Sequence, residues 1–203
     1  MRLVLATKNS HKVAEIKAIL SNFDWEIIPM TELKNNIEII EDGLTFEENA
    51  RKKAEIVYGQ TGFICMGEDT GLEVDALNGQ PGVYSARFAG EKATYEQNVQ
   101  KLLKLLIDVK KPNRTARFRC VCALAFPKSY KQNTVSFEGV CDGQIIEEPR
   151  GKEGFGYDPV FVPDGFEQTF AELHAQVKNK ISHRAKALEK VRKYLEQIRI
   201  NEQ

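Results

Sequence analysis

The sequence lacks the features that mark several large classes of protein. Its 203 residues contain no stretch that approaches the ~20 consecutive apolar residues of a membrane span. There is no internal repeat, no low-complexity block and no linker rich in Pro, Gly or Ser, so we expect a single domain over residues 1–203. Lys and Arg (29) balance Asp and Glu (29), which argues against a protein that coats nucleic acid or a membrane surface.

Cysteine is scarce, and its spacing is not that of a metal site. The four cysteines are Cys65, Cys120, Cys122 and Cys141, with no CxxC pair among them. Cys120 and Cys122 would share one face of a strand, which suits core packing better than zinc binding. Residues 1–6 are too short an apolar segment for the core of a signal peptide. We therefore expect reduced, buried thiols and a cytoplasmic protein.

Apolar spacing predicts strands and helices in a mixed order. Helices are expected over 13–23 and after Thr45, Thr94, Thr169 and Ser182, and each of the three threonines begins a capping box. The predicted strands are residues 3–6, 63–66, 116–126, 135–140 and 160–162. The strand 63–66 is expected to stop at the acids of 67–71, and Asp142-Gly143 is expected to form a hairpin turn. An α/β or α+β fold with a mixed sheet fits this order.

Two predicted helices begin with cations, although the helix dipole disfavours positive charge there by roughly 0.3–1 kcal/mol per residue. Lys8, His11 and Lys12 surround one start, where free backbone N–H groups and the side chains of Thr7 and Asn9 complete a cradle for phosphate. The second start carries a similar set, Lys178, His183 and Arg184, which would suit a polyanion or a base carbonyl. Solvated basic surface turns are the alternative interpretation.

Paired acids supply the complementary charge. Glu68-Asp69 ends a predicted strand, and Glu41-Asp42 precedes a predicted helix. Adjacent carboxylates repel each other unless a cation lies between them, which makes Mg²⁺ the natural partner. The alternative is a pair of acids that cap a turn at Thr70-Gly71.

The segment 151–159 combines three glycines, two aromatic side chains and Asp158. Glycine lets backbone groups approach a base edge, and an aromatic face stacks on a nucleobase. Asp158 would accept a hydrogen bond from a donor on the base or hold the loop in place. An ordinary aromatic and glycine-rich hairpin is the alternative.

Taken together, these segments resemble the inosine/xanthosine triphosphate pyrophosphatases, a family that hydrolyses non-standard purine nucleoside triphosphates. The resemblance runs nearly end to end. It is carried by residues 5–12 with Glu15-Ile16, 43–50 with Lys53-Ala54, 68–72, 81–87, 154–159 and 181–184.

The resemblance implies an α/β fold that is a single two-lobed domain around a long mixed β-sheet with flanking helices, an active cleft between the lobes, and usually a homodimer. It implies that ITP, dITP, XTP and dXTP are cleaved to the monophosphate and pyrophosphate with Mg²⁺, which keeps them out of DNA and RNA.

Residue by residue, the resemblance implies that Glu41 and Asp69 hold Mg²⁺, that Asp69 accepts a proton, and that Lys12 and Lys53 assist at the phosphates. Glu68 stands where we expect Asp at least as often, which leaves it open as a metal ligand or a second base. The phosphates are expected on Thr7, Lys8, Asn9, Ser10, His11 and Lys12. The other expected substrate contacts are Thr70, Phe155, Gly156, Tyr157, Asp158, Lys178, His183 and Arg184.

Three other functions remain open. A pyrophosphatase for modified pyrimidine nucleotides would use the same cations and acids. A nucleotide sensor without catalysis would need only the basic helix starts. The presence of Glu41 and Asp69 disfavours this function, because a sensor needs no catalytic base. A nucleic-acid binding module is disfavoured because no continuous basic stripe with interleaved aromatics is present.

Overall fold

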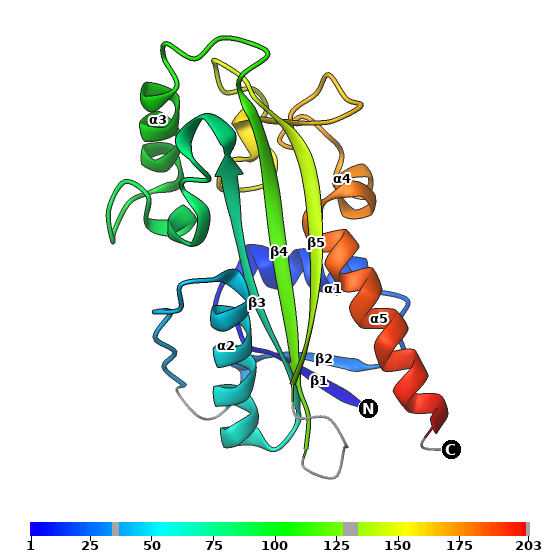
Figure 1. Ribbon diagram of the computed structural model, residues 1–203. Coiled ribbons are helices and arrows are strands. Elements are labelled where there is room, and N and C mark those ends of the chain that lie inside the picture. The colour runs from blue at the N-terminus through cyan, green and yellow to red at the C-terminus, as the bar shows by residue number, and fades with distance from the viewer. Residues whose placement is uncertain (34–36, 128–133, 202–203) are drawn as a thin grey trace. The chain divides into compact units, whose positions relative to one another are not determined.

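The chain forms a mixed β-sheet with flanking helices (Figure 1), and the computed structural model describes residues 1–33, 37–127 and 134–201. Within these residues the sheet has six strands in the order β2-β1-β3-β4-β5-β6. The strands are β1 (Arg2–Leu5), β2 (Glu26–Pro29), β3 (Ile64–Val74), β4 (Thr115–Ala125), β5 (Thr134–Ile145) and β6 (Phe161–Pro163). Strand β1 pairs in parallel with β2 and β3, whereas β5 and β6 are antiparallel. The predicted α/β class with a mixed sheet is confirmed.

Five α-helices accompany the sheet within the described residues. They are α1 (Ser10–Ile19), α2 (Phe46–Thr61), α3 (Tyr95–Leu105), α4 (Ala175–Ile181) and α5 (His183–Asn201). Threonine hydroxyls cap two of them as predicted: Thr45 accepts the N–H of Glu48, and Thr94 forms a complete capping box with Gln97. None of the helices in this part of the chain is long and apolar enough to cross a membrane.

The chain divides into two compact units. The first unit comprises Met1–Asp69, Cys120–Gly139 and Arg184–Gln203, and the second comprises Thr70–Arg119 and Val140–His183. Strands β3, β4 and β5 contribute residues to both units, as their bounds show.

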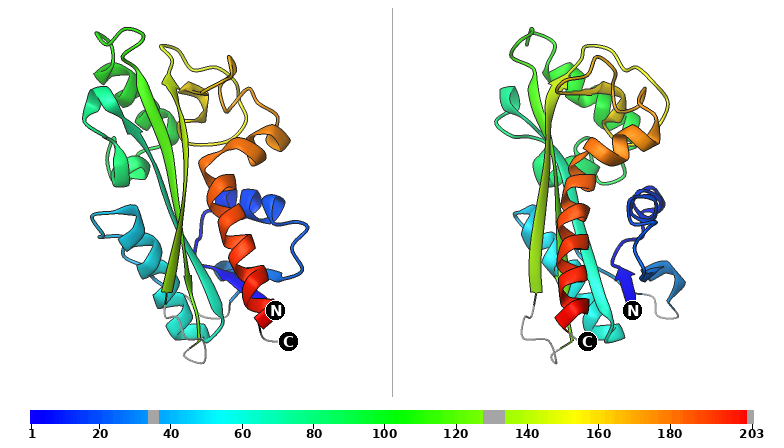
Figure 2. Two further views of the ribbon diagram at one scale, coloured as in Figure 1. Left: turned by 45° about the vertical axis from the view of Figure 1, so that its right-hand side comes forward. Right: turned by 90° about the vertical axis from the view of Figure 1, so that its right-hand side faces the viewer.

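In the first unit, helices cover both faces of the sheet (Figures 1 and 2). Successive residues of a strand point to opposite faces. Leu3 and Leu5 of β1 belong to a core that includes side chains of α1 and α5, such as Ile16 and Leu188. Val4, between the two leucines, belongs instead to a core that includes residues of α2. Helices α1 and α5 therefore lie on one face, and α2 lies on the other.

In the second unit, one face of the strands is apolar and the other is charged. Leu72 of β3 and Phe118 of β4 belong to a core shared with Leu102 of α3. Glu73 and Arg119, which alternate with these residues along the strands, form an ion pair of 2.8 Å and are partly exposed.

Three predictions of local secondary structure are wrong. Strand β3 does not stop at the acids but runs through them to Val74, since buried cations compensate their charge, as described below. The predicted turn at Asp142-Gly143 lies inside β5. A Cβ at Gly143 would lie 2.3 Å from the carbonyl oxygen of Val162, so this glycine admits the neighbouring strand β6.

The third error concerns Thr169, which does not begin a helix. Its hydroxyl donates to the carbonyl of Arg150, and its backbone N–H donates to the side chain of Glu172. The N–H of Glu172 donates to the carbonyl of Thr169 in a turn, and helix α4 begins only at Ala175.

Candidate active site

Helix α2 approaches strand β3 closely because residue 67 is a glycine. A Cβ at Gly67 would lie 2.0 Å from the carbonyl oxygen of Ala50 and 2.7 Å from the backbone nitrogen of Ala54. No other residue tolerates so close a contact between two backbones. Glu68 and Asp69 follow directly, so the close approach brings this acidic pair within reach of polar side chains on α2.

Lys53 of α2 joins the two predicted metal ligands. Its ammonium lies 2.8 Å from Asp69 Oδ1 and 2.7 Å from Glu41 Oε2. Burial lowers the pKa of Lys53, but the two carboxylates raise it above its ordinary value. Burial also raises the pKa of both carboxyls; Lys53 outweighs this effect at Glu41, whose pKa is lowered, but not at Asp69, whose pKa stays raised. Burial therefore dominates the pKa of Asp69, whereas the nearby positive charge dominates that of the more exposed Glu41.

Glu68 is buried among cations. Its Oε1 accepts a hydrogen bond of 2.9 Å from Arg184 and lies 3.7 Å from the ammonium of Lys12. Arg184 is itself buried and also pairs with Glu15. Burial raises the pKa of Glu68, but Arg184 and Lys12 lower it well below its ordinary value. Glu68 is therefore a weak base, and its contacts favour the role of a charge partner.

The loop between β1 and α1 carries the predicted phosphate-binding residues. Asn9 caps α1, because its side chain accepts the N–H groups of His11 at 3.0 Å and of Lys12 at 3.2 Å. The N–H of Asn9 in turn donates to the hydroxyl of Thr7. The expectation of free N–H groups is therefore wrong for His11 and Lys12. The side chains of Lys8, Ser10 and His11 are exposed.

The carboxylates fit the Mg²⁺ ion that the sequence predicts. Glu41 and Asp69 both lie against the ammonium of Lys53, so one positive charge already lies beside both carboxylates. Glu68 Oε2 is buried and has no hydrogen-bond partner within the described ranges. In those same ranges, no group of three or more His, Cys, Asp and Glu side chains is arranged to hold a metal. Two carboxylates completed by water and substrate phosphates are, however, the usual protein contribution to a Mg²⁺ site.

In the second unit, Phe155, Asp158, Phe170 and Lys178 form what we call the Lys178 cluster. The buried ammonium of Lys178 lies 2.6 Å from Asp158 Oδ2, and 5.3 Å and 5.6 Å from the ring centres of Phe155 and Phe170. Asp158 Oδ2 also accepts the backbone N–H of Phe155 at 2.8 Å. Asp158 therefore holds the loop in place, and two aromatic faces lie beside the ammonium.

Tyr157 of the same loop is held by the 81–87 segment. The hydroxyl of the buried Tyr157 donates to the carbonyl of Ser85 at 3.0 Å, and the Ser85 hydroxyl accepts the N–H of Leu72. Gly156, between the two aromatic residues, has a φ of 65°, a conformation that favours glycine. The 81–87 motif therefore connects the loop to strand β3.

His183 and Thr70 are also placed by the second unit. The buried ring of His183 stacks on Phe118 at 4.6 Å between centres and 10° between planes. The Thr70 hydroxyl donates to the carbonyl of Arg119 at 2.7 Å. Arg184, the next residue after His183, belongs to the first unit, where its guanidinium binds the carboxylates of Glu15 and Glu68.

Two residues of the site were given no role by the sequence patterns. Asn49 donates to Asp69, and Glu15 pairs with Arg184. A signal existed for Asn49, because this polar residue falls on the apolar stripe of α2, four residues before Lys53. Glu15 carried no such signal, since a glutamate on a helix is most often solvated.

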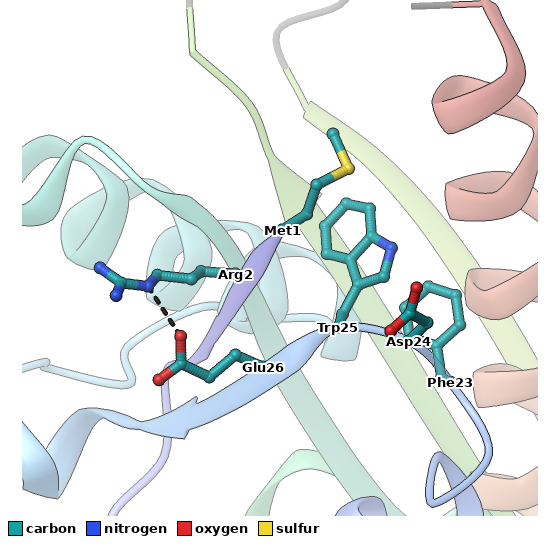
Figure 3. A pocket seen from close by; sticks show the side chains of 6 residues that line it. All are labelled: Met1, Arg2, Phe23, Asp24, Trp25 and Glu26. Atoms are coloured by element: carbon teal, nitrogen blue, oxygen red, sulfur yellow. Dashed lines mark hydrogen bonds and ion pairs between the residues drawn. The ribbon is translucent and has the colours of Figure 1, made fainter. Parts of the chain in front are cut away.

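A pocket of about 460 Å³ lies at the start of the chain, beside strand β2 (Figure 3). Two of its lining residues, Arg2 and Glu26, form an ion pair of 2.8 Å. The residues that line it are Met1, Arg2, Phe23, Asp24, Trp25 and Glu26. None of them is a predicted site residue, so the charged clusters rather than this pocket identify the candidate site.

The chain is similar to known sequences and solved structures over nearly its whole length. A model of the Ham1 family matches residues 3–194. A dITP/XTP pyrophosphatase of Bacillus licheniformis is 49% identical over 195 residues, which cover 96% of this chain and 98% of that protein. The structure of a HAM1 protein from Coxiella burnetii has a TM-score of 0.86 at 42% identity and covers 97% of this chain and 99% of its own. A nucleoside-triphosphatase / dITP/XTP pyrophosphatase structure from Mycobacterium abscessus has a TM-score of 0.75 at 39% identity, covering 94% and 98%.

Proposed function

The chain belongs to the Ham1 family, and we propose on that premise that it hydrolyses ITP, dITP, XTP and dXTP to the monophosphate and pyrophosphate. This activity removes non-standard purine nucleotides before they enter DNA or RNA. Relatives named dITP/XTP pyrophosphatase support the substrate class. The observation that carries the proposal is the buried Asp69, held beside Glu41 by the ammonium of Lys53.

We propose that Asp69 takes a proton from the water whose oxygen attacks the α-phosphorus. The bond from the α-phosphorus to the bridging oxygen breaks, and pyrophosphate leaves with that oxygen. Lys12 and Lys53 offset the negative charge on the leaving group. When bound, Mg²⁺ would be held by Glu41 and Asp69 and would neutralise phosphate charge.

We propose that the phosphates bind at Thr7, Lys8, Asn9, Ser10, His11 and Lys12. His11 and Lys12 would bind them through their side chains, because their backbone N–H groups donate to Asn9. For the base and sugar we propose Phe155 to Asp158 with Lys178 and His183. The roles of Thr70 and Arg184 toward substrate stay predictions. A buried donor that faces the 6-oxo group would reject adenine, because mispaired polar groups are costly.

Four further expectations belong to the same proposal. Residues 1–203 act as one catalytic domain, the metal is Mg²⁺, the protein is a homodimer, and it works in the cytoplasm. The family match over residues 3–194 supports the first. Size-exclusion chromatography with light scattering tests the homodimer.

The central experiment measures pyrophosphate release from ITP, XTP, dUTP, UTP, ATP and GTP with Mg²⁺. Release mainly from ITP and XTP is expected. Preference for dUTP or UTP would indicate the pyrimidine alternative, and binding without turnover would indicate a sensor. Asp69→Asn should lower kcat by about 100-fold or more and still bind nucleotide. Near-normal release by this variant would contradict the role of Asp69.

A further inference from the structure

Asn49 lies in the first turns of α2 and is 2% exposed. Its Oδ1 accepts the backbone N–H of Gly43 at 2.8 Å. Its Nδ2 lies 3.4 Å from the carbonyl oxygen of Gly43 and donates to Asp69 Oδ2 at 3.3 Å. One buried amide therefore joins the 41–43 segment, which carries Glu41, to Asp69 of strand β3.

The orientation of this amide follows from its partners. A backbone N–H must meet an acceptor, so Oδ1 faces Gly43, and the NH₂ group then faces the acceptor-only carboxylate of Asp69. The approach to Gly43 is close: a Cβ there would lie 2.7 Å from Asn49 Oδ1. Gly43 and Asn49 therefore form a fitted contact between the loop and the helix.

Asn49 and Lys53 act on Asp69 as a pair. They are four residues apart and lie on the same face of α2. Lys53 binds Asp69 Oδ1, whereas Asn49 binds Oδ2, so each oxygen of the carboxylate has one donor from the helix. Two donors on separate oxygens fix the rotation of the carboxylate plane, which one donor alone does not.

We propose that Asn49 is a positioning residue, which sets the orientation of Asp69 and its distance from the segment that carries Glu41. This inference rests on the proposed roles of Asp69 and Glu41. The hydrogen-bond partners of metal-binding and catalytic carboxylates commonly contribute about 10–100-fold to activity or metal affinity. In this role Asn49 acts through Asp69 and not on the substrate itself.

The chain contains a matched control for Asn49. Asn98 occupies the equivalent position of α3, four residues after its threonine cap, and is also 2% exposed. Its amide accepts the N–H of Ala89 at 2.7 Å and donates to the carbonyl of Ala86 at 3.1 Å. Asn98 thus makes the same kind of loop contact, but its two side-chain hydrogen bonds to the described residues go to backbone groups and not to a carboxylate.

The test compares Asn49→Leu, Asn98→Leu and Asn49→Asp in the full chain. The measurements are the melting temperature, kcat and KM with ITP, and the affinity for Mn²⁺ in the absence of nucleotide, followed by electron paramagnetic resonance. Both leucine variants should lose similar stability, since each leaves loop groups unpaired. Asn49→Leu should lower kcat and Mn²⁺ affinity about 10–100-fold, with KM changed less than about threefold, whereas Asn98→Leu should keep kcat and Mn²⁺ affinity near wild type.

Asn49→Asp is a second variant of nearly the same size. It keeps the acceptor for Gly43 but replaces the donor to Asp69 by a carboxylate, and its buried charge beside Asp69 costs stability as well. A fall in kcat of about tenfold or more, measured at a temperature at which the variant is folded, supports the proposal. If the Asn49 variants keep kcat and Mn²⁺ affinity as well as Asn98→Leu does, the inference is wrong while the proposed function stands. A wild-type chain that releases no pyrophosphate would overturn both.

Discussion

Replacement of Gly67 by alanine tests the close contact on which the candidate site depends. The added Cβ would lie 2.0 Å from the carbonyl oxygen of Ala50, and ordinary van der Waals contact begins at 3.4 Å. Helix α2 would therefore move by about 1.4 Å if it moved straight away from the strand. Strain of this kind costs about 1–3 kcal/mol of unfolding free energy. For a chain of this size, about 2 kcal/mol corresponds to a fall of roughly 4–8 °C in melting temperature.

The same displacement would move Asn49 and Lys53 away from Asp69. A shift of about 1 Å in a catalytic group costs about 100-fold in rate, so kcat should fall by this factor with KM less affected. Gly59→Ala is the matched control, because it lies in the same helix and a Cβ there meets nothing within 4 Å. This control should raise the unfolding free energy by about 0.5–1 kcal/mol and leave kcat unchanged. A Gly67→Ala protein as stable and active as wild type would refute the reasoning.

The remaining predictions concern buried ionisable groups. Arg184→Met should lower the free energy of unfolding in urea by about 3–5 kcal/mol, because Glu15 and Glu68 lose their buried counter-charge; a loss below about 1 kcal/mol would contradict this. The pKa of Glu68 is below its ordinary value of 4.5, so its ionisation adds stability that is present above that pH and lost as the pH falls further. The melting temperature should therefore decline more steeply in acid for wild type than for Glu68→Gln, and parallel curves would count against the pairing. Burial raises the pKa of Cys65 to about 11, and all four free cysteines are buried. Ellman's reagent at pH 8 should therefore react slowly with the cysteines until urea unfolds the protein. Rapid labelling of the native protein would contradict this prediction.

Predictions from local sequence succeeded where local forces decide the outcome. The caps at Thr45 and Thr94 and the strand that contains Cys120 were correctly predicted, because capping and side-chain periodicity involve near neighbours. Acids normally end a strand, and β3 continues through Glu68 and Asp69 only because distant cations surround them.

The same reason explains the other errors. Gly143 resembles a turn glycine, but strand β6, almost twenty residues further along the chain, makes use of its missing side chain. The N–H groups of His11 and Lys12 resemble free donors until the side chain of Asn9 is placed on them. In each case the decisive partner is a group whose position the residue pattern does not specify.

By itself the sequence determined the set of chemical groups, their order and most of the helices that carry them. The residue pattern predicted local groups of cations and acids that suit a short polyphosphate. The motifs predicted the family. Only the tertiary structure decided which charges pair. Lys53 meets Asp69 across 16 residues, Lys178 meets Asp158 across 20, and Arg184 meets Glu68 across 116. Charge interactions and burial act through space, so they depend on the packing of helices against strands and not on distance along the chain.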